Sequence, residues 1–348
     1  MRLATKRIIL CGLGTVGKAF CRLLWERREQ ITKKYGLGIE IAAAVDVGGA
    51  AVSDQGSLPL DDLLMHLDAG GKVETFSPHG RPGVSGVEAV SSIPAEVLVE
   101  TTPTNLVDGE PARGHIFAAL NNGLDVVSAN KGPLVLFYRE IRDLAKDKGC
   151  RIFMSAATAA ALPTLDVGLI CLAGAKVLAV EGILNGTTNY ILTRMHVEKC
   201  SYETALKAAR EMGIAETDPT LDVEGFDTRN KMVIIANRIF DKHFGPDDVA
   251  IEGITRITLA DIDKAVEAGN VIKLVGTAER NEGGLTISVG PKALEMAHPL
   301  AAVNFAEKGI SYLTDTMGRV TVTGGKSSPM GAAAALLKDL IHTVMLSA

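Results

Sequence analysis

Short apolar runs and amphipathic segments alternate along the first 150 residues of the chain. An apolar run at 8–11 ends in glycines, and apolar side chains then recur at helical spacing, at Val16, Ala19, Phe20, Leu23 and Leu24. The same patterns predict further strands at 39–46, 97–99 and 125–128, and helices at about 111–121 and up to Gly149. Weak signals between 48 and 86 predict a loop-rich excursion. Strands that alternate with helices of this length predict a parallel, doubly wound sheet.

The pattern changes from about residue 151. Helices are predicted at 202–212 and 228–240, and strand-like runs at 271–275, 285–289 and 319–322 indicate a second sheet. The last apolar segment, 332–345, is expected to form a helix that packs back on the first domain. We therefore expect an α/β fold of two domains. Residues 1–150 form the doubly wound domain together with the C-terminal helix 330–348, and residues 151–329 form an α+β domain.

Composition and charge narrow the class of protein. A hydrophobic fraction of 47% in 348 residues is enough for a sizeable core in more than one domain. A net charge of −5 argues against a partner nucleic acid, and no apolar stretch approaches the ~20 residues that span a bilayer. The five cysteines are widely spaced and form no C-x-x-C pair, which is typical of reduced thiols. We expect a soluble, cytoplasmic protein without a membrane partner.

The glycines after the first predicted strand have the pattern of a dinucleotide site. Gly12, Gly14 and Gly17 form G-x-G-x-x-G between that strand and an amphipathic helix. The first permits a tight turn, the second lets a pyrophosphate approach, and the third lets helix and strand pack closely, while the helix N-terminus supplies N–H donors. The alternative is a structural turn without a ligand. We expect NAD or NADP on a Rossmann turn made by Gly12, Leu13, Gly14, Thr15, Val16 and Gly17.

Asp46 closes the second predicted strand, where the adenine ribose of a dinucleotide lies on this fold. A carboxylate that faces the ribose repels a 2′-phosphate, and no arginine follows directly to reverse that effect. We therefore expect NAD to be favoured over NADP. The alternative is that Asp46 is a solvated turn residue.

Five carboxylates and one lysine crowd the segment 213–231, which runs from a loop into a predicted helix. Asp227 and Lys231 are four residues apart and therefore share a helix face. A lysine that reaches a partly buried cleft gives up its proton more readily, which suits it to proton transfer. On spacing alone, the better interpretation is a helix cap at Asp227 with Lys231 as its exposed ion-pair partner.

At this point the sequence resembles the homoserine dehydrogenases. The segment 213–231 is similar to their substrate loop and catalytic helix, and 182–192 (GILNGTTNYIL) matches a hallmark of the family nearly residue for residue. Residues 128–131 (SANK) resemble the family's A-N-K segment, and 100–105 (ETTPTN) its loop on the cofactor side. The resemblance runs from about residue 7 to 340, and the chain length implies the short form without a C-terminal ACT domain.

The resemblance implies a role for each matching residue of the substrate site. Lys231 would be the general acid/base that acts on the substrate hydroxyl or carbonyl, oriented by Asp227. Glu216 and Asp227 would hold the substrate ammonium, with Asp222 nearby. Gly186 and Thr187 would line the substrate pocket. The reaction implied is the NAD(P)-dependent interconversion of L-homoserine and L-aspartate 4-semialdehyde, a step of threonine and methionine biosynthesis.

The resemblance also implies cofactor contacts and an assembly. Lys131 would lie beside the nicotinamide and the reacting oxygen. Thr102, Gly213 and Ser328 would lie on the cofactor side. The second domain would carry catalysis and would form a homodimer through its sheet.

Two segments depart from the family pattern. The family loop that supplies backbone carbonyls to sodium usually reads Glu-Ala-x-Val and then glycines, whereas residues 155–163 here read SAATAAALP. Alanine in place of glycine restricts the backbone, so we do not expect a sodium ion at the carbonyls of Ser155, Thr158, Ala160 and Leu162. The family's Gly-Ala-Gly turn near the nicotinamide is replaced by Lys326-Ser327-Ser328-Pro329.

These departures leave two other interpretations open. A diverged dehydrogenase acting on a related small hydroxy acid would explain the altered loops. A dinucleotide-binding sensor without catalysis would be expected to lack the two lysines, yet Lys131 and Lys231 are both present.

Overall fold

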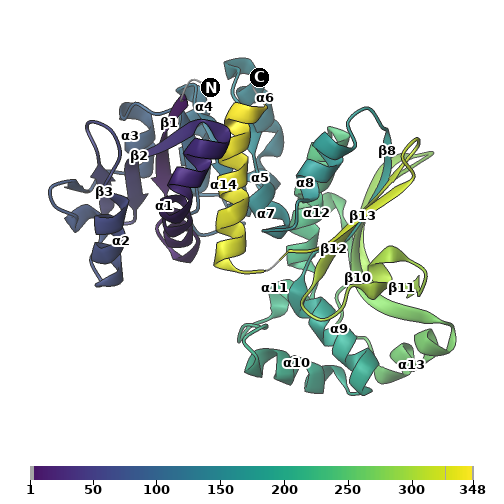
Figure 1. Cartoon of the computed structure of the whole chain (residues 1–348). Helices are drawn as coiled ribbons and strands as arrows, with labels where there is room; N and C mark the ends of the chain where they lie inside the picture. The colour runs from purple at the N-terminus through teal and green to yellow at the C-terminus, as the bar shows by residue number, and fades with distance from the viewer. Residues whose placement is uncertain (1–3, 326, 347–348) are drawn as a thin grey trace. The chain divides into compact units, whose positions relative to one another are not determined.

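The computed structural model describes residues 4–325 and 327–346. The chain divides into two compact units, the first comprising Met1–Ala160 and Ser328–Ala348, the second Ala161–Ser327. Figure 1 labels the elements of both units. The expected α/β fold, a parallel sheet accompanied by a second sheet, is confirmed. Lys326 lies outside the described residues.

A seven-stranded sheet forms the centre of the first unit, in the order β4-β3-β2-β1-β5-β6-β7. Its strands are β1 (Ala4–Cys11), β2 (Leu37–Asp46), β3 (Gly49–Val52), β4 (Gly80–Pro82), β5 (Val97–Glu100), β6 (Asp125–Ser128) and β7 (Ile152–Phe153). The five strands β2, β1, β5, β6 and β7 run parallel to one another. The strands β3 and β4 are antiparallel additions at the edge next to β2. The carboxyl ends of β1, β5 and β6 therefore lie side by side, which is where ligands bind in sheets of this kind.

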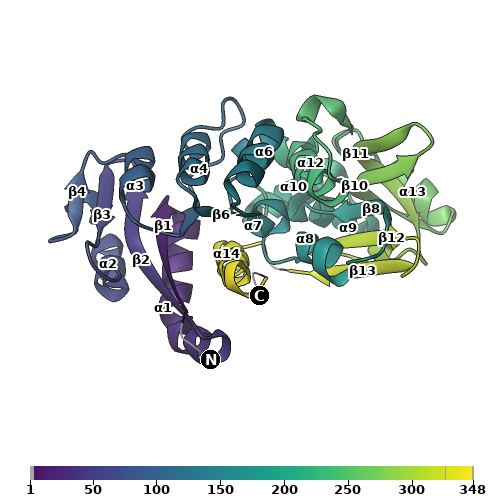
Figure 2. The ribbon, with the colours of Figure 1, turned by 90° about the horizontal axis from the view of Figure 1, so that it is seen from above.

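Alternating side chains of β1 face two separate cores. Ile8 and Leu10 belong to a cluster with α1 (Thr15–Tyr35), α2 (Leu60–Asp68) and the C-terminal helix α14 (Pro329–Met345). Ile9 and Cys11 belong to a cluster on the other face with the helices α3 (Gly86–Ser92), α4 (Ala112–Asn121) and α6 (Tyr138–Lys148). Figure 2 shows helices on both faces. A strand buried on both faces is hydrophobic at every position, as the run 8–11 is.

The prediction of a loop-rich excursion between 48 and 86 is wrong. The strands β3 and β4, helix α2 and the short helix η1 (Val73–Thr75) occupy this segment. Leu60, Leu63, Leu64 and Leu67 are buried at helical spacing, so the apolar stripe of α2 was present in the sequence. Two further short helices, α5 (Lys131–Leu136) and α7 (Ser155–Ala159), follow the ends of β6 and β7.

The second unit is built on a six-stranded sheet in the order β13-β12-β8-β10-β11-β9. Its strands are β8 (Val177–Ile183), β9 (Ala250–Ile251), β10 (Asn270–Asn281), β11 (Gly284–Glu295), β12 (Lys308–Thr314) and β13 (Arg319–Gly324). Neighbours are antiparallel except β9, which runs parallel to β11. The sequence pattern had not marked β8 or β12.

The second unit also contains helices, several of them short. They are α8 (Thr164–Asp166), the π-helical η2 (Val167–Cys171), α9 (Gly186–Glu198), α10 (Tyr202–Glu211), α11 (Thr220–Val223), α12 (Phe226–Phe240), η3 (Pro246–Asp248), α13 (Leu259–Glu267) and η4 (Pro299–Ala302). Side chains of α12 pack on β10, where a Cβ on Gly276 would meet Met232. In the described part of the chain, every helix is too short or too polar to cross a membrane.

Candidate active site

The turn from β1 to α1 uses its three glycines in three different ways. Gly12 has a φ of +94°, and a Cβ there would lie 2.6 Å from the backbone nitrogen of Thr102. A Cβ on Gly17 would lie 2.0 Å from the carbonyl oxygen of Gly12. A Cβ on Gly14, by contrast, would meet nothing within 4 Å. The packing of the chain therefore requires the first and third glycines, whereas the second borders open space at a helix N-terminus, where a phosphate can approach. The residues of this turn fit a dinucleotide.

Asn130 connects the two loops that follow β5 and β6. Its side-chain amide donates to the carbonyl oxygens of Thr102, at 2.9 Å, and Pro103, at 3.0 Å. Its oxygen caps α5 by accepting from the backbone nitrogen of Gly132, at 3.0 Å. This cap places Lys131, half-buried, at the first residue of α5. The Gly12 turn, the Thr102 loop and Lys131 thus meet at the carboxyl ends of β1, β5 and β6.

A buried carboxylate supports this loop, and the sequence interpretation did not assign it a role. Glu100 is 0% exposed. One of its oxygens accepts from the backbone nitrogen of Thr102, at 2.7 Å, and from the Thr102 hydroxyl. The other lies 2.8 Å from Nδ1 of His115. Burial, followed by the charge of Glu100, raises the pKa of the Cys11 thiol beside them, so this thiol is a poor metal ligand. The cluster fixes the Thr102 loop, and the Thr101 hydroxyl joins this loop to the Gly12 turn by donating to the carbonyl oxygen of Gly12, at 2.6 Å.

A cavity of about 360 Å³ opens beside Asp46 at the carboxyl end of β2. One carboxylate oxygen of Asp46 accepts from the backbone nitrogen of Val47, at 2.9 Å. Lys18, Lys72 and Glu74 also line this cavity. The charge where a ribose would lie is therefore set by two carboxylates and two ammonium groups, and Asp46 is only one of them.

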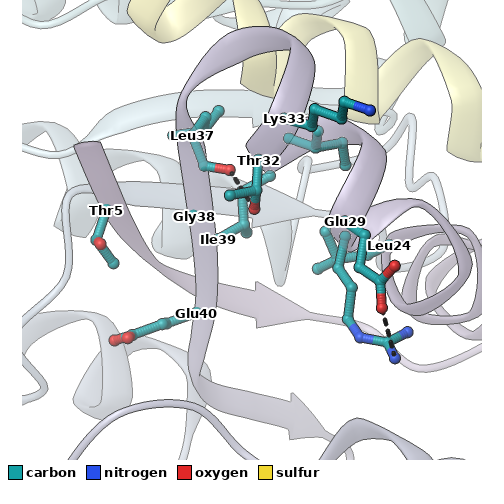
Figure 3. A pocket seen from close by; sticks show the side chains of 11 residues that line it. Thr5, Leu24, Glu29, Thr32, Lys33, Leu37, Gly38, Ile39 and Glu40 are labelled. Atoms are coloured by element: carbon teal, nitrogen blue, oxygen red, sulfur yellow. Dashed lines mark hydrogen bonds and ion pairs between the residues drawn. The ribbon is translucent and has the colours of Figure 1, made fainter. Parts of the chain in front are cut away.

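A second cavity of the first unit, about 520 Å³, lies at the opposite end of the sheet (Figure 3). It is lined by the second half of α1 and by Thr5, Leu37, Gly38, Ile39 and Glu40, near the amino ends of β1 and β2. The hydroxyl of Thr32 there donates to the carbonyl oxygen of Leu37, at 3.3 Å. None of the predicted site residues borders this cavity. We therefore do not assign the cavity to the cofactor site.

In the second unit, Asp227 and Lys231 lie in the first turns of α12. The Lys231 ammonium donates to the carboxylate of Asp227 and, at 2.9 Å, to the carbonyl oxygen of Leu184. Both side chains are 14% exposed. Leu184 follows directly after β8, so the pair is held against the end of a central strand. The ion pair that the spacing favoured is present, but the expectation that Lys231 is exposed is wrong, and Gly225 rather than Asp227 is the N-cap of α12.

Asn185 ties two of the expected carboxylates together. Its amide nitrogen donates to Asp222, at 2.6 Å, and to Asp227, at 3.0 Å. Its oxygen caps α9 by accepting from the backbone nitrogen of Thr188, at 3.0 Å. One buried side chain therefore fixes the start of α9 and the positions of both carboxylates. Asn185 lies in the segment that resembled the family hallmark, but the sequence interpretation gave it no role.

The remaining residues of the expected substrate site surround this group unevenly. Gly186 begins α9, and a Cβ there would lie 3.0 Å from the carbonyl oxygen of Ala306. The Thr187 hydroxyl donates to the carbonyl oxygen of Ile214, at 3.1 Å, which ties α9 to the loop after α10. That loop carries Gly213, with a φ of +68°, and the exposed Glu216. Glu216 is thus exposed to solvent, while Asp227 and Lys231 are largely buried.

The comparisons with known proteins agree on one family. The family model for homoserine dehydrogenase matches residues 163–341, and the model for the homoserine dehydrogenase NAD binding domain matches residues 12–155. The chain belongs to the homoserine dehydrogenase family. It is 38% identical to homoserine dehydrogenase from Methanocaldococcus jannaschii over 96% of this chain and 97% of that one. It is 34% identical to NAD(+)-dependent homoserine dehydrogenase from Pseudomonas canavaninivorans over 97% and 95% of the two chains.

Solved structures lead to the same family. The homoserine dehydrogenase from Thiobacillus denitrificans has a TM-score of 0.84 at 28% identity, over 99% of this chain and 74% of that one. The resemblance of the sequence to the homoserine dehydrogenases is thereby confirmed. The segments that carried it, 100–105, 128–131, 182–192 and 213–231, lie within the two matched regions.

The altered loop of this family member is held by side chains of its own. Ser155 donates two hydrogen bonds to Asp339 of α14, one from its backbone nitrogen, at 2.9 Å, and one from its hydroxyl, at 2.8 Å. The Lys338 ammonium lies 2.9 Å from the Ser155 hydroxyl oxygen. The carbonyl oxygen of Ser155 accepts from the Thr158 hydroxyl, at 2.7 Å.

Two of the four positions whose carbonyls the family would offer to sodium, Ser155 and Ala160, have a particular local structure here. Ser155 uses its carbonyl oxygen within the loop, and Ala160 adopts a φ of +54°, which alanine rarely does. An ammonium group already stands beside the loop. The residues present do not fit a sodium site, and no step below depends on that ion. Ser328 caps α14, its side chain accepting from the backbone nitrogen of Gly331, at 3.0 Å.

Proposed function

We propose that this protein is an NAD(P)-dependent homoserine dehydrogenase, which interconverts L-homoserine and L-aspartate 4-semialdehyde. The observation that carries the proposal is the largely buried pair of Asp227 and Lys231, fixed against the end of β8 and joined to Asp222 through Asn185. Such a pair combines a proton donor with carboxylates for an amino-acid ammonium, as this reaction requires. Membership of the family supports the same activity.

Within this proposal the second unit handles the proton and the amino acid. Lys231 takes the hydroxyl proton when homoserine is oxidised and returns it to the carbonyl oxygen in the reverse reaction. The carboxylate of Asp227 orients the Lys231 ammonium, and the carbonyl oxygen of Leu184 limits the rotation of that ammonium. Asp222 and Asp227, whose positions Asn185 fixes, bind the substrate ammonium together with the exposed Glu216. Gly186 and Thr187 line the pocket, and Gly213 lies toward the cofactor.

The first unit holds the dinucleotide, which supplies a hydride acceptor or donor when bound. Gly12, Leu13, Gly14, Thr15, Val16 and Gly17 form the pyrophosphate turn. Thr102 and Lys131, which Asn130 links, contribute the nicotinamide side together with Ser328, and Asp46 faces the adenine ribose. The unit Met1–Ala160 with α14 is thus the cofactor domain, and the unit Ala161–Ser327 is the catalytic domain.

We infer further that the protein works as a homodimer in the cytoplasm. The face of the second sheet that includes Glu181 supports the homodimer. Arg319, His298 and Lys292 lie around the Glu181 carboxylate and lower its pKa despite its burial. These charged side chains form a surface on a central strand. The five unpaired cysteines support a reducing compartment. Light scattering of the purified protein tests the dimer.

The test of the function is turnover of L-homoserine with NAD and with NADP, beside a panel of related hydroxy acids. Lys231→Ala is expected to keep the fold and the dinucleotide affinity but to lose ~100-fold or more in turnover, the scale for a positioned proton donor. Lys231→Arg is expected to rescue little, because a guanidinium stays protonated.

One other function has specific observations in its favour. The departures at Ser155 and Ser328 favour a dehydrogenase for a related hydroxy acid, and faster turnover of another member of the panel would establish it. Near-normal turnover in Lys231→Ala, with loss in Lys131→Ala, would instead assign the proton to Lys131. Dinucleotide binding without turnover of any substrate would indicate a sensor.

A further inference from the structure

Two lysines of the second unit are buried almost completely. Lys273 is 0% exposed and Lys308 is 2% exposed. Lys273, on β10, is surrounded by neutral oxygens: Val303 O at 2.6 Å, Asn189 Oδ1 at 3.0 Å, Asn304 Oδ1 at 3.1 Å and Thr193 Oγ1 at 3.2 Å. This arrangement joins α9 and β10 to the loop after η4, which accounts for its burial. Lys308 has a different environment.

The strand register places Lys308 at the proposed acid–base pair. Lys308 begins β12, which is antiparallel to β8 with Gly309 opposite Ile183. One step further, Lys308 lies at the level of Leu184, whose carbonyl oxygen accepts from Lys231. The two lysines therefore reach the same strand end, one from the neighbouring strand and the other from α12.

The side of the sheet agrees with this placement. Side chains alternate along a strand, so Lys308 and Tyr312 share one face of β12 and Gly309 belongs to the other. The ring of Tyr312 borders Gly168 together with Ile239 of α12, whereas a Cβ on Gly309 would meet Val303 and Leu300. Lys308 thus lies on the face that α12 covers.

The charges around Lys308 are those of the acid–base pair. Burial, followed by the like charge of Lys231, lowers the pKa of Lys308 to about 8, and the carboxylate of Asp227 works in the opposite direction. Asp222 adds a second carboxylate on α11, linked to Asp227 through Asn185. Two ammonium groups thus act on Asp227, where the sequence suggested only one.

This second ammonium answers a chemical difficulty. A lysine must give up its own ammonium proton before it can act as a base in the oxidation of an alcohol, so an environment that disfavours its charged form helps the reaction. A buried cation nearby destabilises that charged form, and this is a known way to activate an amine. When two such groups interact strongly, their protons leave in steps that belong to the pair.

We propose that Lys308 is a positioning residue for the acid–base chemistry: it joins Lys231 and Asp227 in one coupled group, which releases its first proton more readily than Lys231 and Asp227 would alone. The proposal rests on the proposed function of Lys231. Lys308 does not touch the substrate in this scheme, and its effect passes through Lys231.

The test compares the pH profile of kcat for homoserine oxidation in the wild type, Lys308→Met, Lys308→Arg and Lys273→Met. Turnover rises with pH as the coupled group loses a proton. In Lys308→Met, the midpoint of that rise is expected to lie about one pH unit or more above the wild-type midpoint. At a given pH on the acid side, kcat is then expected to be lower than that of the wild type by about tenfold per unit of displacement, whereas KM changes little. Lys308→Arg keeps the charge, and its profile is expected to stay at or below the wild-type pH. Lys273→Met removes an equally buried lysine of the same unit, and its profile is expected not to move.

An unchanged profile in a folded Lys308→Met protein would overturn the inference, and so would an equal displacement in Lys273→Met. Lys308→Met is expected to fold, because an apolar side chain of similar length replaces a buried charge without leaving a cavity. Wild-type protein without any homoserine turnover would defeat the proposed function instead, so the two failures are distinct.

A readout independent of activity is the NMR titration of the lysine Cε signals. Removing Lys231 by Lys231→Ala is expected to raise the titration midpoint of Lys308, because the like charge is gone while Asp227 remains. A midpoint that stays the same would show that the two lysines are not coupled, and would also overturn the proposal.

Discussion

Asn185 offers the sharpest perturbation of the proposed substrate site, because one side chain does two separable things. Its oxygen caps α9, and its amide nitrogen bridges Asp222 and Asp227. Asn185→Ser keeps a good capping residue but is too short to bridge the carboxylates. Asn185→Asp keeps the cap and the shape but replaces the donor by a third carboxylate. The pair therefore separates the helix cap from the positioning of the carboxylates.

The magnitudes follow from the contacts. A hydrogen bond to a charged group contributes about 1.5–3 kcal/mol, which corresponds to about 10- to 100-fold in rate if it acts in the transition state. Asn185→Ser is therefore expected to lose about 10- to 100-fold in kcat/KM for homoserine, while its unfolding free energy changes by about 1 kcal/mol or less. Steady-state kinetics and chemical denaturation measure the two quantities.

Asn185→Asp is expected to be worse than Asn185→Ser. The distances of 2.6 Å and 3.0 Å would become contacts between carboxylates, and like charges this close cannot all ionise. The new carboxyl group would retain its proton in the folded state, so the variant binds more protons folded than unfolded. Its stability relative to the wild type is then expected to fall as the pH rises.

Wild-type kcat/KM in a folded Asn185→Ser protein would refute the reasoning, since Asn185 would then only cap α9. Equal losses in the two variants would refute the electrostatic part, because a third carboxyl group beside Asp222 and Asp227 would then make no difference.

Three further predictions concern the cofactor unit. Gly14→Val is expected to keep the melting temperature, because a Cβ there meets only open space, but to abolish NAD binding in calorimetry, because the side chain occupies the path of the pyrophosphate. Gly17→Val is expected to prevent folding, because a Cβ there would lie 2.0 Å from the carbonyl oxygen of Gly12. An unchanged NAD affinity in Gly14→Val would contradict the assignment. Asp46→Ser is expected to narrow a preference for NAD over NADP, measured as the ratio of the two kcat/KM values; a wild-type enzyme better with NADP and unaffected by the change would show that Asp46 does not face the ribose. Replacement of sodium by choline is expected to leave turnover unchanged, and a saturable activation by sodium would restore the family's cation site.

The sequence alone determined the features that depend on neighbouring residues. Gly12, Gly14 and Gly17 lie in a turn between a strand and a helix within ten residues, so the pattern and its spacing were sufficient to predict this local structure. Asp227 and Lys231 share a helix face because they are four residues apart. The alternation of strands and helices predicted the doubly wound sheet because parallel strands need a crossover between them. The segments that resemble the homoserine dehydrogenases identified the family.

Only the tertiary structure decided which charged groups are buried and which of them meet. The sequence alone favours Lys231 as the exposed partner of a surface ion pair. In the structure, the residue after β8, Leu184, places its carbonyl oxygen at the Lys231 ammonium. Asn185 reaches Asp222 and Asp227, 37 and 42 residues further along the chain. Lys308 joins this group only through the pairing of β12 with β8. A periodic pattern tells which face of a strand is buried, but not which strand lies beside it, and the partner strand decides which charges share a low-dielectric site.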